Sequence, residues 1–548
     1  MQITCTDLSF SYPEQATPLF DGVTFSISDE SRLGIIGPNG SGKSTLLGLL
    51  TGRLQPTAGA VGRSRPTPRI ALIEMDEGDN RPVVASALAV RDPRLAHSWE
   101  VMQADAGSDS ALEASAAFAA ADGYVVLAET QRTLAQTGVS NRLWGHTVAS
   151  LSVGERLWLR VAEATLAGAD LLLLDEPTSH LDIRKRAELA VTLQDLDRPY
   201  VIVSHDRHFL DLVCTQVLEL THGHSRLYAG GYTSYVATVR SEEEHDQDVY
   251  DTQTRKVRQL KQAIGASRQH AANIELLAHK SSFIGKTHYS AIAARLEKRA
   301  KAMRRQLERS LAEAQAAKPF IEKKRTFAID GTTRGGILAS FESVSAMARD
   351  RILFSNLSLT VRGGEHWCIL GPNGAGKSTL LSILLGKRQP DSGAASMARS
   401  IKVGYVPQQV SLTHGDELPI DLVRSASGLT REDARLLLGT LGIEDEQVFQ
   451  PISQLSAGQQ KRAFIAQIVA GAPDLLVIDE LEGNLAIDAI VQLERALSEF
   501  SGALIMVTHD IALAQVVGEQ FLTLDGQGGW SRENVFADVG SLPTHNLR

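Results

Sequence analysis

Two nine-residue stretches combine glycines, a lysine and hydroxyl residues in an order that binds phosphate groups in many proteins. They are GPNGSGKST, from Gly37 to Thr45, and GPNGAGKST, from Gly371 to Thr379. Each follows a short apolar run and precedes a helical pattern, which is the context in which the G-x-x-x-x-G-K-S/T motif is specific. Two nearly identical nine-residue stretches are not expected to arise as chance glycine-rich turns. The sequence therefore predicts two nucleotide phosphate sites.

The residue types in each loop predict their contacts with a nucleoside triphosphate. Glycines let the backbone curl so that N–H groups point at phosphate oxygens, and the N-terminus of the next helix adds partial positive charge. We expect Lys43 and Lys377 to reach the β- and γ-phosphates, and Ser44 and Ser378 to ligate Mg²⁺. The predicted nucleotide-binding residues of the loops are Gly37, Asn39, Gly40, Ser41, Gly42, Lys43, Ser44, Thr45, Gly371, Asn373, Gly374, Ala375, Gly376, Lys377, Ser378 and Thr379.

A pair of carboxylates ends an apolar run in each half of the chain. LLLLDE ends at Glu176, and LLVIDE ends at Glu480. We expect Asp175 and Asp479 to hold Mg²⁺ through water. We expect Glu176 and Glu480 to polarise the attacking water as general bases.

A histidine follows a further apolar run in each half, at His205 in YVIVSHD and at His509 in LIMVTHD. A lone histidine is more often structural. Here both lie at the end of a predicted strand and at the same distance after a carboxylate pair. We therefore expect them to orient the attacking water or the γ-phosphate.

These motifs recur in one order, which indicates duplication of a domain. LSVGE starts at Leu151 and LSAGQ at Leu455, 304 residues apart, and the carboxylate pairs and histidines keep that spacing. The phosphate loops are 334 residues apart, so the first copy holds about 30 extra residues, expected within 91–130. Short β-rich runs alternate with helical patterns, which predicts α/β domains around mostly parallel sheets. The expected boundaries are 1–240, 241–325 and 326–548.

Composition excludes several classes of protein. A hydrophobic content of 43% and a charged content of 22% suit a globular chain. No run of about 18 apolar residues occurs and the N-terminus has no secretory pattern, so we expect neither a membrane span nor export. The three cysteines, Cys5, Cys214 and Cys368, are far apart and odd in number. They favour a reducing compartment and argue against a disulfide framework or a zinc site.

Positive charge is concentrated in one segment of an acidic chain. The net charge is −9, yet residues 252–312 hold fourteen Lys or Arg and three Glu, a net +11, so the remainder carries −20. This separation favours a polyanionic partner, bound through salt-sensitive phosphate contacts. The alternative is a solvated spacer, but a neutral mixture of Glu and Lys would serve solubility equally well.

Apolar residues in this segment recur at spacings of three, four or seven. They predict two helices of about 30 residues packed as an antiparallel coiled coil, an arm of about 45 Å with its tip within 279–289. The stripe residues are Val257, Leu260, Ile264, Ala271, Ile274 and Leu277 in one helix and Ile292, Leu296, Met303, Leu307 and Leu311 in the other.

Phosphate loop, LSxGx signature, DE pair and histidine occur twice in the order of ATP-binding cassettes, and the chain resembles that superfamily over almost all its length outside the basic segment. In that superfamily two cassettes pack head to tail, and each ATP lies between the phosphate loop of one and the signature of the other. The resemblance implies that ATP closes the pair and that hydrolysis lets the halves separate. The implied composite sites join Lys43 to Ser456 and Gly458, and Lys377 to Ser152 and Gly154.

The two copies depart from the superfamily pattern in different places. The glutamine that usually reaches the metal is Gln408 in KVGYVPQQ, whereas Met75 stands at that place in the first copy. A thioether is a poor ligand for a hard metal, so Asp76 or water must substitute.

Two more differences concern the base of ATP and the loop between the sites. Tyr12 precedes the first phosphate loop and is placed to stack on adenine, whereas the matching stretch VSAMARD has no aromatic residue. Ala486 replaces Asp182 in the loop that normally communicates between the sites. We predict unequal sites, and the sequence does not say which is slower.

Twin cassettes, no membrane segment and an interdomain helical arm resemble the ABC-F family, and KPFIEKK at 318–324 is similar to that family's junction after the arm. Members bind the ribosomal exit-tRNA site, and the arm reaches toward the neighbouring tRNA and the peptidyl-transferase centre. The resemblance implies a monomeric, cytoplasmic ATPase that uses ATP and Mg²⁺ and contacts rRNA and tRNA through residues 252–312. At the tip, Phe283, Ile284, His288 and Tyr289 either stack on RNA or only cap the coiled coil.

Some ABC-F members displace ribosome-targeting antibiotics, and others regulate or rescue translation. The short first-cassette insertion and long arm favour antibiotic protection here. The alternatives are a housekeeping translation factor of the same family, the ATPase subunit of a transporter with separate membrane chains, and a DNA-binding ATPase. We expect no C-terminal DNA-binding extension, which disfavours the last.

Overall fold

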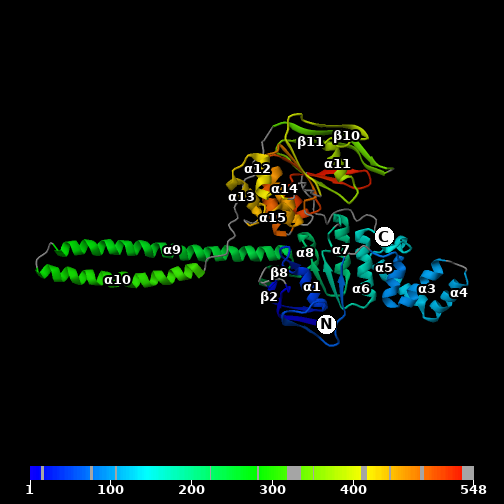
Figure 1. The fold of residues 1–548 in the computed structure, drawn as a ribbon, viewed down its shortest axis with the longest axis horizontal. Coiled ribbons are helices and arrows are strands. Elements are labelled where there is room, and N and C mark those ends of the chain that lie inside the picture. The colour runs from blue at the N-terminus through cyan, green and yellow to red at the C-terminus, as the bar shows by residue number, and fades with distance from the viewer. Residues whose placement is uncertain are drawn as a thin grey trace. The chain divides into compact units, whose positions relative to one another are not determined.

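A computed structural model describes residues 1–533 except 14–17, 75–77, 105–107, 180, 222–223, 280–282, 317–334, 350, 409–415, 444–445, 482–484 and 486 (Figure 1). The chain divides into two compact units. One unit combines Met1–Thr233, here called cassette 1, with Arg325–Arg548, called cassette 2; the other is Ser234–Lys324, called the arm.

Each cassette contains a six-stranded sheet of the same topology. In cassette 1 the order is β5-β6-β7-β3-β8-β9, in which β9 alone runs antiparallel to its neighbour. In cassette 2 it is β14-β15-β16-β12-β17-β18, with β18 antiparallel. The strands are β5 Ile70–Ile73, β6 Leu171–Asp175, β7 Tyr200–Val203, β3 Arg32–Ile36, β8 Gln216–Thr221, β9 His224–Ala229, β14 Val403–Val406, β15 Leu475–Asp479, β16 Ala503–Val507, β12 His366–Leu370, β17 Gln520–Leu524 and β18 Trp530–Glu533.

A three-stranded antiparallel sheet accompanies each of these. Its order is β2-β1-β4 in cassette 1 and β11-β10-β13 in cassette 2. The strands are β1 Gln2–Phe10, β2 Phe20–Ser28, β4 Ala58–Arg63, β10 Ile337–Ala348, β11 Arg351–Arg362 and β13 Ser392–Met397. The prediction of a duplicated α/β domain is thereby confirmed.

The central strands are continuous apolar runs because both faces of the parallel sheet are buried, as cassette 2 shows: helices cover one face, and α11 (Lys377–Leu384) with the three-stranded sheet covers the other. The sequence LLLLD of β6 is buried at its first four positions, and LLVID of β15 is buried throughout. Since all three central strands run in parallel, the segments that follow β6, β7 and β3 emerge at one edge of the sheet. The same holds for β15, β16 and β12, and these segments carry the predicted site residues.

Helices pack around the sheets and carry several of the motifs. In cassette 1 they are α1 Lys43–Thr51, α2 Val83–Arg91, α3 Pro93–Ala104, α4 Asp109–Ala120, α5 Gly123–Gln136, α6 Val153–Leu166, α7 Ile183–Asp195 and α8 Arg207–Val213. In cassette 2 they are α11 Lys377–Leu384, α12 Pro419–Ser427, α13 Arg431–Thr440, α14 Ala457–Ala470, α15 Ile487–Ser498 and α16 Ile511–Val517. Within the described residues, α2–α5 stand in cassette 1 where cassette 2 has α12 and α13.

Across the described residues, no single helix is long and apolar enough to cross a bilayer. The pair α4 and α5 passes a length and composition test only together, and it is bent by 81° at its break.

The arm contains all but the first two residues of α9, Tyr232–His279, and all of α10, Phe283–Ala316. These helices have 48 and 34 residues, more than the roughly 30 predicted for each. Helix α9 is the longer because it begins directly after the last strand of cassette 1. Its start is fixed by Asp211 of α8, which accepts hydrogen bonds from Thr233 N (2.8 Å) and Thr233 Oγ1 (2.6 Å).

The predicted apolar stripe is the inward side of the arm where its side chains are described. Val257, Ile264 and Ile274 are buried, and Leu260 is half-buried. In α10, Ile292, Leu296, Met303, Leu307 and Leu311 are half-buried. The side chains of Ala271, Leu277 and the four tip residues lie outside the described part of the chain, although α10 already begins at Phe283.

We expect Ile264→Ala to loosen the arm without disturbing the cassettes. Truncating a buried isoleucine costs about 2 kcal/mol or more, so the locally open population rises roughly 30-fold. Trypsin, which cuts after the many Lys and Arg of residues 252–312, should cleave the variant there correspondingly faster. The matched control is Gln262→Ala, an exposed position two residues away; equal cleavage of both variants would contradict the buried stripe.

Candidate functional site

Each phosphate loop curls around the lysine that follows it. In cassette 1, Lys43 Nζ donates to Gly37 O (2.8 Å) and Pro38 O (3.0 Å). The equivalent bonds in cassette 2 join Lys377 Nζ to Gly371 O (2.9 Å) and Pro372 O (3.0 Å). Both ammonium groups therefore sit under the loop, at the start of α1 and α11, where a phosphate chain would be received.

The first glycine of each loop cannot be replaced without moving backbone. Gly37 has φ +149°, and a Cβ there would lie 2.0 Å from Leu220 O. Gly371 has φ +143°, and its Cβ would lie 2.4 Å from Leu524 O. Inside the first loop, Ser41 Oγ is buried and makes no hydrogen bond with the described residues. A buried hydroxyl without a partner fits a loop shaped to donate to phosphate oxygens.

Each predicted general base is held in the same unusual backbone conformation. Glu176 has φ +49° and Glu480 has φ +51°, in the left-handed region. Their N–H groups donate to Val203 O (2.9 Å) and Val507 O (3.0 Å), on the neighbouring strands. A glutamate in this region costs of order 1 kcal/mol, and such strain is common at functional sites.

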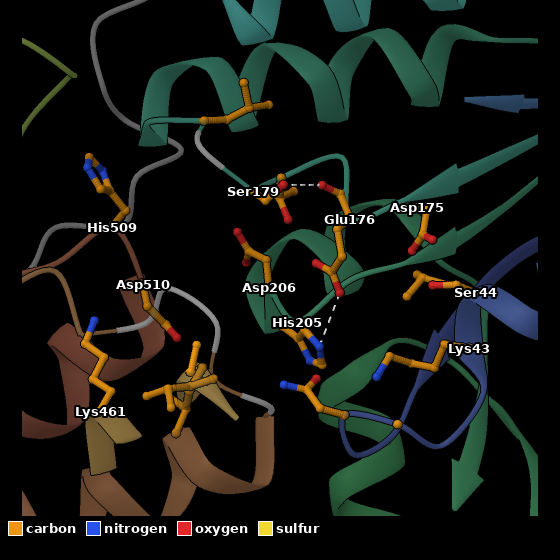
Figure 2. A pocket seen from close by; sticks show the side chains of 18 of the residues that line it. Lys43, Ser44, Asp175, Glu176, Ser179, His205, Asp206, Lys461, His509 and Asp510 are labelled. Carbon is orange, nitrogen blue, oxygen red and sulfur yellow. Dashed lines mark hydrogen bonds and ion pairs between the residues drawn. The ribbon is translucent and has the colours of Figure 1, made fainter. Parts of the chain in front are cut away.

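The two predicted histidines face these glutamates at the same distance. His205 Nε2 lies 3.3 Å from Glu176 Oε1, and His509 Nε2 lies 3.3 Å from Glu480 Oε1. Figure 2 shows His205 directed at Glu176, with Asp175 and Lys43 nearby. The structure thus brings together the acid and histidine that the sequence pairs in each cassette.

The two glutamates differ in their electrostatic surroundings. Burial raises the pKa of Glu176 to about 7, and its Oε1 atom is fully buried although 32% of the side chain is open to the cavity. Burial, with the charge of Lys43, lowers the pKa of His205 to about 4. In cassette 2 the hydrogen bond with His509, aided by Gln408, lowers the pKa of Glu480.

The predicted metal residues are adjacent in cassette 2. Ser378 Oγ donates to Asp479 Oδ1 at 3.4 Å, and burial raises the pKa of Asp479. Gln408 Nε2 donates to Glu480 Oε2. In cassette 1, Ser44 and Asp175 line one cavity, whereas Met75 and Asp76 lie outside the described residues.

A cavity of about 1380 Å³ contains most of the predicted first site. Figure 2 shows Lys43 and Ser44 on one side of it, and Lys461, His509 and Asp510 of cassette 2 on the other. The predicted residues that line it are Tyr12, Asn39, Gly40, Gly42, Lys43, Ser44, Thr45, Asp175, Glu176, His205, Asn373, Gly374, Gln408, Glu480 and His509.

Other predicted residues do not line this cavity. Ser456 and Gly458 do not, although Ala457 between them does. Ser456 caps α14, and Ser152 caps α6, each in a capping box, so each signature serine marks a helix N-terminus, a place suited to an anion. Tyr12 is 41% exposed, and its hydroxyl lies 3.0 Å from Thr45 Oγ1.

One loop residue crosses between the cassettes. Asp182 caps α7 through Lys185 N (3.0 Å), and its second oxygen accepts from Asn373 N in the opposite phosphate loop at 2.9 Å. Its counterpart in sequence, Ala486, lies outside the described residues, and an alanine side chain has no acceptor.

Sequence reasoning missed several residues of the cavity. Lys461 Nζ donates to Glu480 O at 2.7 Å, and Arg186 and Asp206 also line the cavity. The signal was available, because aligning the two copies places Leu157 opposite Lys461. A charged residue in one copy and an apolar one in the other marks a difference between the sites.

Comparison with known proteins decides the family. A family model described as ABC transporter matches residues 20–179 and 354–482, more than half of the chain. The protein named "Probable ATP-binding protein YbiT" of Escherichia coli O157:H7 is 30% identical over 519 residues, covering 90% of this chain and 91% of YbiT. The ATP-binding cassette sub-family F member 3 of Homo sapiens is 29% identical, covering 97% of this chain and 72% of that protein. The chain belongs to the ABC-F family.

Two further similarities place this ABC-F protein. The ribosome protection protein VmlR of Bacillus subtilis (strain 168) is 28% identical, covering 96% of this chain and 87% of VmlR. A crystal structure of archaeal ribosomal stalk protein aP1 with the archaeal ribosome recycling factor aABCE1 matches with a TM-score of 0.60 and 16% identity, covering 96% of this chain and 89% of that chain. At that identity the second similarity shows the twin-cassette fold alone. The predictions of ATP-binding cassettes with ATPase domains are confirmed.

The unequal carboxylates predict unequal pH dependence. A base must be deprotonated, so activity that depends on Glu176 falls as the pH drops through about 7. We expect phosphate release by Glu480→Gln, which retains Glu176, to drop several-fold between pH 8 and pH 6. Activity of Glu176→Gln, which retains Glu480 with its lowered pKa, should stay nearly level over that range. Identical profiles for the two variants would contradict this assignment.

Proposed function

We propose that this ABC-F ATPase binds the ribosome in its ATP-bound, closed state and acts through residues 252–312 near the tRNA and the peptidyl-transferase centre. We propose ribosome protection against antibiotics as its role and the cytoplasm as its place of action. The observation that carries the proposal is an arm whose apolar residues face inward and whose basic residues face outward. The similarity to VmlR, a ribosome protection protein, supports it.

The charge on the arm is available to a partner. Within residues 252–312 the exposed basic side chains are Arg255, Lys256, Arg258 and Lys261 on α9, and Arg295, Lys298, Arg299, Lys301, Arg304, Arg305 and Arg309 on α10. No carboxylate among the described side chains pairs with them. By contrast, Arg240 at the root of α9 pairs with Glu244 at 3.1 Å. Outward cations that make no ion pair with a described carboxylate suit the phosphate backbone of RNA.

At each ATP site we propose the roles that the residue types suggest. Lys43 and Lys377 bind the β- and γ-phosphates, and Glu176 and Glu480 activate water. Mg²⁺, when bound, stabilises the charge of the leaving phosphate. Ser44 and Asp175 would hold it at one site, and Ser378, Gln408 and Asp479 at the other. The signature serines Ser152 and Ser456 complete the γ-phosphate contacts when the cassettes close.

Removing both bases should trap the closed state. A Glu176→Gln, Glu480→Gln double variant binds ATP but cannot hydrolyse it, so we expect it to co-sediment with ribosomes in ATP and to separate from them in ADP. The matched control adds Lys43→Ala and Lys377→Ala, which removes ATP binding and should abolish co-sedimentation. The proposed function in translation would be wrong if the double variant stayed in the supernatant at low salt and the wild type showed no ribosome-stimulated hydrolysis.

Neutralising the arm should flatten the salt dependence of ribosome binding. We expect the quadruple variant Lys298→Gln, Arg299→Gln, Lys301→Gln and Arg304→Gln to lower the slope of log affinity against log salt by roughly one for each phosphate that the arm no longer neutralises. The charge-preserving control Lys298→Arg with Lys301→Arg should keep the wild-type slope.

A drug-susceptibility panel in a strain lacking the protein then separates antibiotic protection from a housekeeping role in translation.

A further inference from the structure

A buried arginine of cassette 1, Arg207, contacts cassette 2 next to His509. Arg207 is the first residue of α8, two positions after His205, and is only 7% exposed. Its Nη1 donates to Glu494 Oε2 at 3.0 Å, its Nη2 donates to Glu494 Oε1, and Nη2 also reaches Asp510 Oδ2 at 3.1 Å. Glu494 lies on α15, and Asp510 directly follows His509.

A second arginine of cassette 1 reaches the same loop. Arg186, on α7, donates through Nη1 to His509 O at 3.1 Å and to Asp206 Oδ2 at 2.8 Å. Its Nε donates to Leu181 O at 2.9 Å, which fixes the guanidinium to the loop before α7. Arg186 therefore links the residue after His205 to the backbone of His509 itself.

These contacts have no equivalent in the opposite direction at the matching sequence positions. With the repeat spacing of 304 residues, Arg207 corresponds to Ile511, Arg186 to Ile490 and Glu494 to Ala190. Each of these three charged residues is apolar in the other copy. Asp206 and Asp510 do correspond, and each caps its own helix, α8 or α16.

We propose that Arg207 and Arg186 are positioning residues for ATP hydrolysis at the second site, fixing the His509–Asp510 loop so that His509 faces Glu480. This inference rests on the proposed roles of His509 and Glu480. It makes the position of the second histidine depend on contact with cassette 1, whereas the matching positions of cassette 2 hold apolar residues that cannot support the first histidine in the same way.

The physical reason is that a buried arginine restricts the position of the carboxylates that it binds. A bidentate guanidinium–carboxylate pair has a fixed planar geometry, so it defines the position of Asp510 as well as holding it. When the cassettes separate, water replaces these contacts and the loop loses its external support. Removing one partner alone leaves a buried charge unpaired and is strongly destabilising, whereas replacing the pair by apolar residues is far milder.

The chain itself supplies the matched variant. Arg207→Ile with Glu494→Ala reproduces the apolar pair that stands at Ile511 and Ala190 in the other copy. Site-resolved turnover comes from two backgrounds: Glu176→Gln leaves the second site active, and Glu480→Gln leaves the first. We expect the double replacement to lower kcat of the second site roughly 10- to 100-fold with KM for ATP nearly unchanged, and to change the first site less than about threefold.

Conservative and independent variants separate positioning from simple stabilisation. Arg207→Lys keeps the charge but loses the bidentate geometry, so we expect partial recovery of second-site kcat relative to Arg207→Ile. Arg186→Gln should lower kcat of the second site more than that of the first without disturbing the buried pair, and it serves if the double replacement fails to fold; some loss at the first site is expected because Arg186 also holds Asp206. Arg240→Gln, which removes an exposed ion pair, is the control that should leave both sites unchanged.

Equal losses at both sites would overturn the proposal, because they would mark a general contribution to cassette closure. Unchanged second-site kcat would overturn it as well. Failure of the underlying assignment gives a different result: the Glu176→Gln, Glu480→Gln double variant would then still hydrolyse ATP.

Discussion

The parallel pairing of three buried strands is the constraint on which both ATP sites depend. In cassette 1, β6, β7 and β3 are neighbours, and in cassette 2, β15, β16 and β12 are neighbours. The segments that leave these strands carry the carboxylates, the histidine and the phosphate loop, which lie far apart in sequence. Because neighbouring parallel strands end at one edge, apolar burial of the sheet brings these residues to the same place. The identical 3.3 Å separations of His205 from Glu176 and of His509 from Glu480 follow from that shared scaffold.

The sequence predicted whatever depends on local pattern. The glycines of the phosphate loops, the DE pairs and the arm's apolar stripe have one-dimensional signatures, and the α/β fold, the cassettes and the buried positions Val257, Ile264 and Ile274 were confirmed. What the sequence could not give is the effect of surroundings. Glu176 and Glu480 are the same residue in the same motif, yet burial raises one pKa and a histidine contact lowers the other. Lys461 and Arg207 were missed because they lie outside known motifs and matter only through the cassette they face.

The inequality between the copies has a common structural theme. Several charged residues of one copy stand opposite apolar residues in the other. Asp182 reaches Asn373 across the cassettes, while Ala486 has no group to reach Asn39. Arg186 and Arg207 of cassette 1 likewise donate hydrogen bonds to residues of cassette 2. Asp182, Arg186 and Arg207 are thus three residues of the first copy whose side chains make polar contacts with the second copy.

The charge along α9 changes sign within one unbroken helix. Residues 232–251 hold one Arg and six Asp or Glu, whereas the following stretch is basic. Electrostatic interaction between exposed charges extends about 8 Å at physiological ionic strength, about one and a half helical turns. The positive charge of the distal part of α9 therefore gives way to negative charge within a few residues of Asp251. The position of this change of charge along α9 is fixed by the amino-acid sequence of the helix.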